Sequence, residues 1–207
     1  NRALAAKAWS PAIRTASSGD RSIPVKRWPP VTQEHSQQPV ASSQEMHSHP
    51  APEKLGKVSF ATSCAPKVAH DFERAVALLH SFAYTASEKA FNDVALADPT
   101  CAMAHWGVAM SYFHELWSPP EPDELAKGEA EAEKASHLPV RTERERLFIA
   151  AINAYYRDAD HVPPATRAKA YETAMAAAAK RYPADTEVQV FYALSLVATA
   201  SPLYKSH

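Results

Sequence analysis

The sequence predicts an all-α protein made of stacked helical hairpins, preceded by a disordered tail over residues 1–54. Two observations support this fold class. Only 4 of the 207 residues are glycine, about 2% where soluble proteins average ~7%, and strand turns and phosphate-binding loops need glycine. Apolar residues recur at helical spacing through most of residues 55–200, with prolines between the periodic segments.

The stretch from Cys101 to Leu116 is the most apolar of the predicted helices. Large apolar residues recur in it at intervals of three and four, and small residues occupy the remaining face. Pro99 ends whatever element precedes it, because proline cannot continue a helix from its predecessor. A helix this apolar is expected to be covered on two or three sides, like the inner helix of a stack of hairpins.

The other helices are expected on both sides of this central one. Their apolar periods and flanking prolines place them at 68–83, 86–97, 123–137, 143–156, 164–181 and 186–199. Thr142 and Glu145 form a Thr-x-x-Glu capping box, which marks a helix start. Leu55, Val58 and Phe60 alternate ahead of the first helix, and we expect them to lie along the first hairpin.

The tail has a different composition from the rest of the chain. Residues 1–52 hold seven prolines and clusters of serine and glutamine, without a sustained apolar period. Such a segment cannot bury enough apolar surface to offset the entropy lost on ordering, so we expect disorder. Its Met-His-Ser-His sequence at 46–49 offers two histidines to a metal, but we interpret it as part of a polar tail.

Charge and motifs argue against several functions. The net charge of −1 gives no overall field that would attract nucleic acid or an anionic membrane. No apolar run approaches the ~20 residues that span a bilayer. The sequence contains no glycine-rich phosphate loop and no GxSxG, HExxH or CxxC motif. We therefore expect a protein that is not an enzyme and has no cofactor, no metal, no nucleic-acid partner and no membrane span.

A shift of 34 residues aligns the first predicted hairpin with the central helix. Six pairs of similar residues then align, among them Phe72 with Trp106, Val76 with Met110, and His80 with His114. The first hairpin also has a small residue at Ala75, aromatic residues at Tyr84 and Phe91, and a closing proline at Pro99. In these positions and in its period the chain resembles the tetratricopeptide repeat family, whose unit is a helix–turn–helix of 34 residues. The run from Thr62 to Gly107 also resembles a bacterial group of these proteins that has no assigned role and is often exported.

The resemblance covers roughly residues 68–200 and is imperfect. Ser87 and Val94 stand where the motif prefers alanine, and the second unit is longer than 34 residues. It implies an α-α superhelix over residues 55–200, with about three hairpins and one further helix. An unrelated bundle of α-hairpins is the alternative.

The resemblance also implies a function. First helices of such repeats line an inner groove that receives extended peptides or partner helices. We therefore expect a non-enzymatic scaffold for a protein or peptide partner, with His80 and His114 near one accessible surface. A self-assembling structural protein and a histidine-dependent metal-binding protein are the alternatives. The candidate groove residues are Phe72, Val76, His80, Trp106, Met110 and His114.

The chain has two cysteines, Cys64 and Cys101, separated by 37 residues, one repeat plus three. In the repeat arrangement that the resemblance implies, both lie at the same end of neighbouring first helices, whose axes are ~8–10 Å apart. The segment before the first helix can lean across to the ~4.4–6.8 Å that a disulfide requires. We therefore expect a disulfide and a periplasmic or extracellular location; two reduced, buried cysteines are the alternative.

Residues 186–199 are apolar on almost every side. A terminal repeat normally presents a polar outer face. We therefore expect either that the chain is a fragment of a longer superhelix or that this helix mediates homo-oligomer formation.

Overall fold

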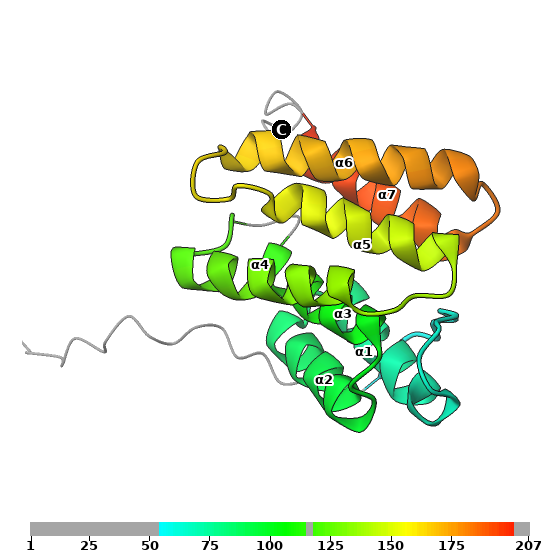
Figure 1. The fold of residues 1–207 in the computed structure, drawn as a ribbon. Coiled ribbons are helices and arrows are strands. Elements are labelled where there is room, and N and C mark those ends of the chain that lie inside the picture. The colour runs from blue at the N-terminus through cyan, green and yellow to red at the C-terminus, as the bar shows by residue number, and fades with distance from the viewer. Residues whose placement is uncertain (1–53, 115–117, 201–207) are drawn as a thin grey trace, which may run out of the picture. The chain divides into compact units, whose positions relative to one another are not determined.

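A computed structural model of the protein describes residues 54–114 and 118–200 (Figure 1), so the predicted tail, except Lys54, lies outside the described residues. All regular structure in the described part of the chain is helical, as predicted. A short 3-10 helix, η1, precedes seven α-helices: η1 (Pro66–Val68), α1 (Ala69–His80), α2 (Tyr84–Ala97), α3 (Ala102–Phe113), α4 (Pro122–His137), α5 (Glu143–Tyr156), α6 (Pro164–Arg181) and α7 (Thr186–Thr199).

The helices pack mainly against their neighbours in the chain. Each helix from α1 to α6 contacts the next one, and α3 also contacts α1 and α5. Figure 1 shows α5 and α6 side by side, with α3 and α4 on the side of α5 away from α6. The odd-numbered helices α1, α3 and α5 therefore lie next to one another. No helix within residues 54–114 and 118–200 is both long and apolar enough to cross a membrane.

Local side-chain bonds define several helix starts. The predicted capping box is present at α5, where the Thr142 side chain accepts the Glu145 N–H and the Glu145 side chain accepts the Thr142 N–H. A second capping box, which the sequence analysis did not identify, joins Glu121 and Glu124 at the start of α4. Each box satisfies backbone N–H groups that a helix start leaves without partners.

Two helix ends differ from the prediction. Helix α1 ends before a turn at Phe82, whose φ of 57° is left-handed, and α2 begins at Tyr84, two residues before the predicted start. The central helix ends at Phe113, because His114 has a left-handed φ of 49°. The predicted end at Leu116 falls among residues 115–117, outside the described residues.

Close packing of α2 on α3 depends on a glycine. The ring of Phe91, itself fully buried, lies where a side chain at Gly107 would begin, so a Cβ there would collide with the ring.

The same relation holds between Gly128 of α4 and the Tyr156 ring of α5. The Tyr156 hydroxyl donates a 2.8 Å bond to the Ala109 carbonyl of α3. Helix α3 is buried on nearly all sides, as its composition predicted.

Candidate functional site

A non-helical stretch ahead of η1 lies against α1, α3 and α5. We call residues 55–65 the lead-in segment; they form no helix or strand. The side chain of Phe60 is its anchor, with only 3% of the residue exposed. The Phe60 ring centroid lies 5.4 Å from that of Phe72 in α1, 5.6 Å from that of Trp106 in α3 and 5.2 Å from that of Phe148 in α5. One side chain of the segment thus touches three helices.

Three carboxylates accept hydrogen bonds from the main chain of the lead-in segment. The Phe60 N–H donates to Glu73 of α1 at 3.2 Å, and the Ala65 N–H donates to Asp98, which follows α2, at 2.7 Å. The Ser63 N–H and its hydroxyl both donate to Glu145 of α5. Because Glu145 is only 1% exposed, these bonds satisfy a carboxylate that has almost no access to water.

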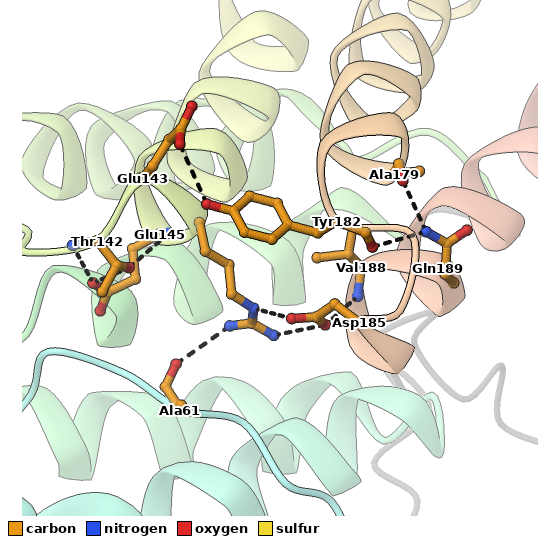
Figure 2. A network of polar contacts seen from close by, with 10 residues as sticks. Ala61, Thr142, Glu143, Glu145, Ala179, Tyr182, Asp185, Val188 and Gln189 are labelled. Atoms are coloured by element: carbon orange, nitrogen blue, oxygen red, sulfur yellow. Dashed lines mark hydrogen bonds and ion pairs between the residues drawn. The ribbon is translucent and has the colours of Figure 1, made fainter.

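Arg144 connects the lead-in segment to the start of α7. Its guanidinium lies 4.2 Å from the Phe60 ring centroid, and its Nη1 donates to the Ala61 carbonyl at 3.3 Å. The same guanidinium donates two bonds, of 2.6 and 3.2 Å, to Asp185, which caps α7 through the Val188 N–H (Figure 2). Burial opposes ionisation of Asp185, but the bonds from Arg144 and Val188 outweigh it, so the pKa of this carboxyl lies below its ordinary value.

We call the side chains that hold the lead-in segment the seat. They come from α1, α3, α5 and the turn after α2, and they combine an aromatic slot with charged hydrogen-bonding groups. The seat consists of Phe72, Glu73, Asp98, Trp106, Arg144, Glu145 and Phe148.

A disulfide closes the end of the lead-in segment. Cys64 is bonded to Cys101, the residue before α3, with a Cα–Cα distance of 4.7 Å. This pair is the one that the sequence analysis expected. The Asp98 carboxylate also lies near the two sulfurs. Within the described residues, this is the one group of three side chains whose possible metal-ligand atoms lie close together. Since the sulfurs are bonded to each other, only the carboxylate is left as a ligand.

Four of the predicted groove residues lie in the core. Phe72, Val76 and Trp106 are fully buried and Met110 is 3% exposed, so in this conformation a partner has almost no access to them. The helical spacing that suggested a groove here reflects packing between helices. Phe72 and Trp106 do line the seat, but the lead-in segment covers them.

The two predicted histidines are half-buried, and both lie in the neighbourhood of Tyr84. His80 Nε2 lies 2.7 Å from a carboxylate oxygen of Glu187, and His80 also lines a small hollow together with Tyr84. The His114 ring centroid is 4.7 Å from that of Tyr84. Burial lowers the pKa of His114, against the opposing attraction of Glu124.

Two larger hollows flank the first residues of the lead-in segment. One, of about 440 Å³, lies between the segment and the α1 residues His70, Glu73 and Arg74. The other, of about 360 Å³, reaches Phe82 and the α7 residues Val190 and Leu194. Gly56, Lys57, Val58 and Ala77 line both hollows. The beginning of the segment is therefore less tightly enclosed than Phe60.

Helix α7 buries one face and exposes apolar residues on another. Its buried residues are Val188, Phe191 and Ser195. Leu196 is 43% and Val197 55% exposed. Homo-oligomer formation through this helix remains a prediction.

The polar groups of the seat could not be predicted from the sequence. Glu145 was assigned to a capping box, which is present, but the same carboxylate also binds Ser63, 82 residues away. Arg144 and Asp98 carried no signal beyond their positions near a helix start and a proline. Local patterns cannot reveal contacts over such separations.

Comparison with known proteins found no matching family model, no matching curated protein and no matching solved structure.

We expect Asp98→Asn to reduce the free energy of unfolding at pH 7 by about 1–2 kcal/mol, since a charge-assisted bond to the Ala65 N–H is weakened. This bond is the main reason that the pKa of Asp98 is lowered. A carboxyl group whose pKa is lower in the folded than in the unfolded protein stabilises the fold when the pH is above the unfolded-state pKa of ~3.9. This stabilisation is lost as the pH falls through the pKa of the folded state. The difference between variant and wild type should therefore shrink in urea titrations at pH 3.

Asp93→Asn is the matched control for this experiment. Asp93 is exposed, and among the described residues it pairs only with Lys89 one turn away, so its loss should change stability by less than ~0.5 kcal/mol. An Asp98→Asn effect of equal size at pH 7 and pH 3 would show that the carboxylate charge does not hold the lead-in segment.

Proposed function

We propose that residues 55–200 form a non-enzymatic binding scaffold, an α-α superhelix of the tetratricopeptide type that holds an extended polypeptide against its first helices. The observation that carries this proposal is the lead-in segment. It is bound as peptide ligands are bound, through main-chain hydrogen bonds and one aromatic side chain in a slot.

The chemistry of the seat supports a peptide as the natural occupant. Glu145 is almost fully buried, and its oxygens need donors of the kind that a main-chain N–H supplies. Arg144 needs an acceptor beside the aromatic slot, and a main-chain carbonyl supplies it. The disulfide is consistent with an oxidising compartment, so we place the scaffold in the periplasm or outside the cell, with a protein or peptide as its partner.

The test is to empty the seat and offer it a peptide. A full-length variant with Phe60→Ala, Cys64→Ser and Cys101→Ser, called the open variant, loses both the aromatic anchor and the covalent bond of the segment. The probe is a fluorescein-labelled peptide with the sequence of residues 57–63, Lys-Val-Ser-Phe-Ala-Thr-Ser. Fluorescence anisotropy should show saturable binding with a Kd on the order of micromolar, corresponding to about −8 kcal/mol.

A matched control replaces a different phenylalanine. The variant Phe82→Ala, Cys64→Ser, Cys101→Ser loses an exposed ring and keeps Phe60 in the slot, so the probe should bind it at least tenfold more weakly. Circular dichroism checks that both variants stay helical, and a Phe60→Leu version of the open variant replaces it if it unfolds. Equal binding of the probe to the open and control variants, or to neither, contradicts the proposal.

A further inference from the structure

We propose that the lead-in segment is an intramolecular ligand that blocks the seat and that the Cys64–Cys101 disulfide holds it there as a latch. Reduction of this disulfide admits a partner in its place. That partner is an extended segment with an aromatic residue followed three residues later by serine or threonine. This inference rests on the proposed function. It adds the class of ligand and the condition under which the seat becomes available.

The position of the disulfide makes it a latch. Cys64 lies between Ser63 and Ala65, whose N–H groups bind Glu145 and Asp98. With the bond intact, this part of the segment is fixed to Cys101 at the start of α3, and a partner cannot take its place at Glu145. Without it, the segment can pivot at Pro66, where η1 begins.

The opening step is a thiol–disulfide exchange. A dithiol reductant transfers two electrons and two protons to the bond, so that Cys64 and Cys101 become thiols and the reductant becomes its own disulfide. Cys64 is only partly buried, whereas Cys101 is almost fully buried, so attack on the Cys64 sulfur is the accessible route.

The seat defines the ligand pattern. The slot between Phe72, Trp106 and Phe148 takes a ring, and the Arg144 guanidinium lies over one face of that ring. Three residues further along, the Ser63 hydroxyl donates to Glu145 and accepts the Arg141 N–H at 3.0 Å. An aromatic residue and a hydroxyl residue at this spacing therefore satisfy the same groups when they come from another chain.

Displacement can begin at the loosely held end. The hollows of about 440 and 360 Å³ lie beside Gly56, Lys57 and Val58, so a competing peptide can make its first contacts with the protein there. The segment stays attached to η1, which keeps its effective concentration high, near the millimolar range of a short tether. Exchange therefore requires an excess of the partner segment and the loss of the latch.

The test compares oxidised and reduced wild-type protein. Hydrogen exchange followed by mass spectrometry should show slow exchange of the three amides that donate to the seat, those of Phe60, Ser63 and Ala65, in the oxidised protein. Their exchange should become at least tenfold faster after dithiothreitol. The labelled peptide of residues 57–63 should bind the reduced protein at least tenfold more tightly than the oxidised one. Peptides with Phe→Ala or with the final Ser→Ala should each lose at least tenfold in affinity for the reduced protein.

The control is the full-length variant Cys64→Ser, Cys101→Ser, which should bind the peptide equally with and without dithiothreitol. If reduced wild type keeps the Phe60, Ser63 and Ala65 amides protected and excludes the peptide while the open variant binds it, the latch is wrong and the proposed function stands. If the open variant also excludes the peptide, the proposed function fails. Equal affinity of the three peptides overturns the ligand pattern.

Discussion

Trp106→Ala is expected to reduce the free energy of unfolding by about 3–5 kcal/mol, the range for truncating a large aromatic side chain in a core. Trp106 is fully buried and lies at the centre of the aromatic cluster. Its ring centroid is 5.6 Å from that of Phe60, 5.3 Å from that of Phe148 and 5.4 Å from that of Phe191. The substitution therefore leaves a cavity between α3, α5, α7 and the lead-in segment. Urea titration followed by circular dichroism measures the effect.

Two variants separate the volume of this side chain from its polarity. The Trp106 Nε1 has no acceptor among the described residues, so Trp106→Phe removes a buried donor without a partner while keeping a ring. We expect it to cost less than half as much as Trp106→Ala. Leu96→Ala, at a residue that is 80% exposed, should change stability by less than ~0.5 kcal/mol. A Trp106→Ala cost below ~1 kcal/mol would contradict the central role of this residue.

Gly107→Ala is expected to destabilise the protein by about 1–3 kcal/mol, although alanine favours a helix by ~1 kcal/mol over glycine. The added Cβ would meet the Phe91 ring, which is fully buried. That ring also packs edge-on against Phe72, with centroids 5.4 Å apart, so it cannot move without disturbing the packing of α1. Thermal unfolding should show a lower midpoint temperature.

Gly56→Ala is the matched control, since no atom of the described residues beyond the two chain neighbours lies within 4 Å of a Cβ at that position. The same chemical change should there alter stability by less than ~0.5 kcal/mol. If Gly107→Ala proved neutral or stabilising, α2 and α3 would be separated more widely than the structure places them.

The helices of this chain could be predicted well because their signals are local. The predicted ranges 143–156, 164–181 and 186–199 coincide with α5, α6 and α7. Apolar period, capping residues and proline act within a few residues of the helix that they define. The ends at Phe82 and His114 were missed because both are non-glycine residues in the left-handed region, and side-chain identity gives little warning of that conformation.

The seat could be predicted only in part. The alternation of Val58 and Phe60 indicated a segment that lies on a hairpin, and the spacing of the cysteines, interpreted through the repeat, indicated their bond. Contact of Phe60 with α3 and α5 depends on how the helices stack, which no local pattern determines. Glu145 illustrates the limit, because a residue with a satisfactory role in its own helix gives no sign of a second, distant role.

The sequence separation of the lead-in contacts has a consequence for folding kinetics. Helical hairpins form through contacts close in sequence and fold rapidly, but Ser63 and Ala61 reach Glu145 and Arg144 across 82 and 83 residues. The contacts of Ser63 and Ala61 can form only after α5 has joined α3, so we expect these contacts to form late, after the transition state. Contacts of that kind change the folding rate little and mainly slow unfolding. We therefore expect these long-range contacts of the lead-in segment to lengthen the time that a native molecule persists before it unfolds.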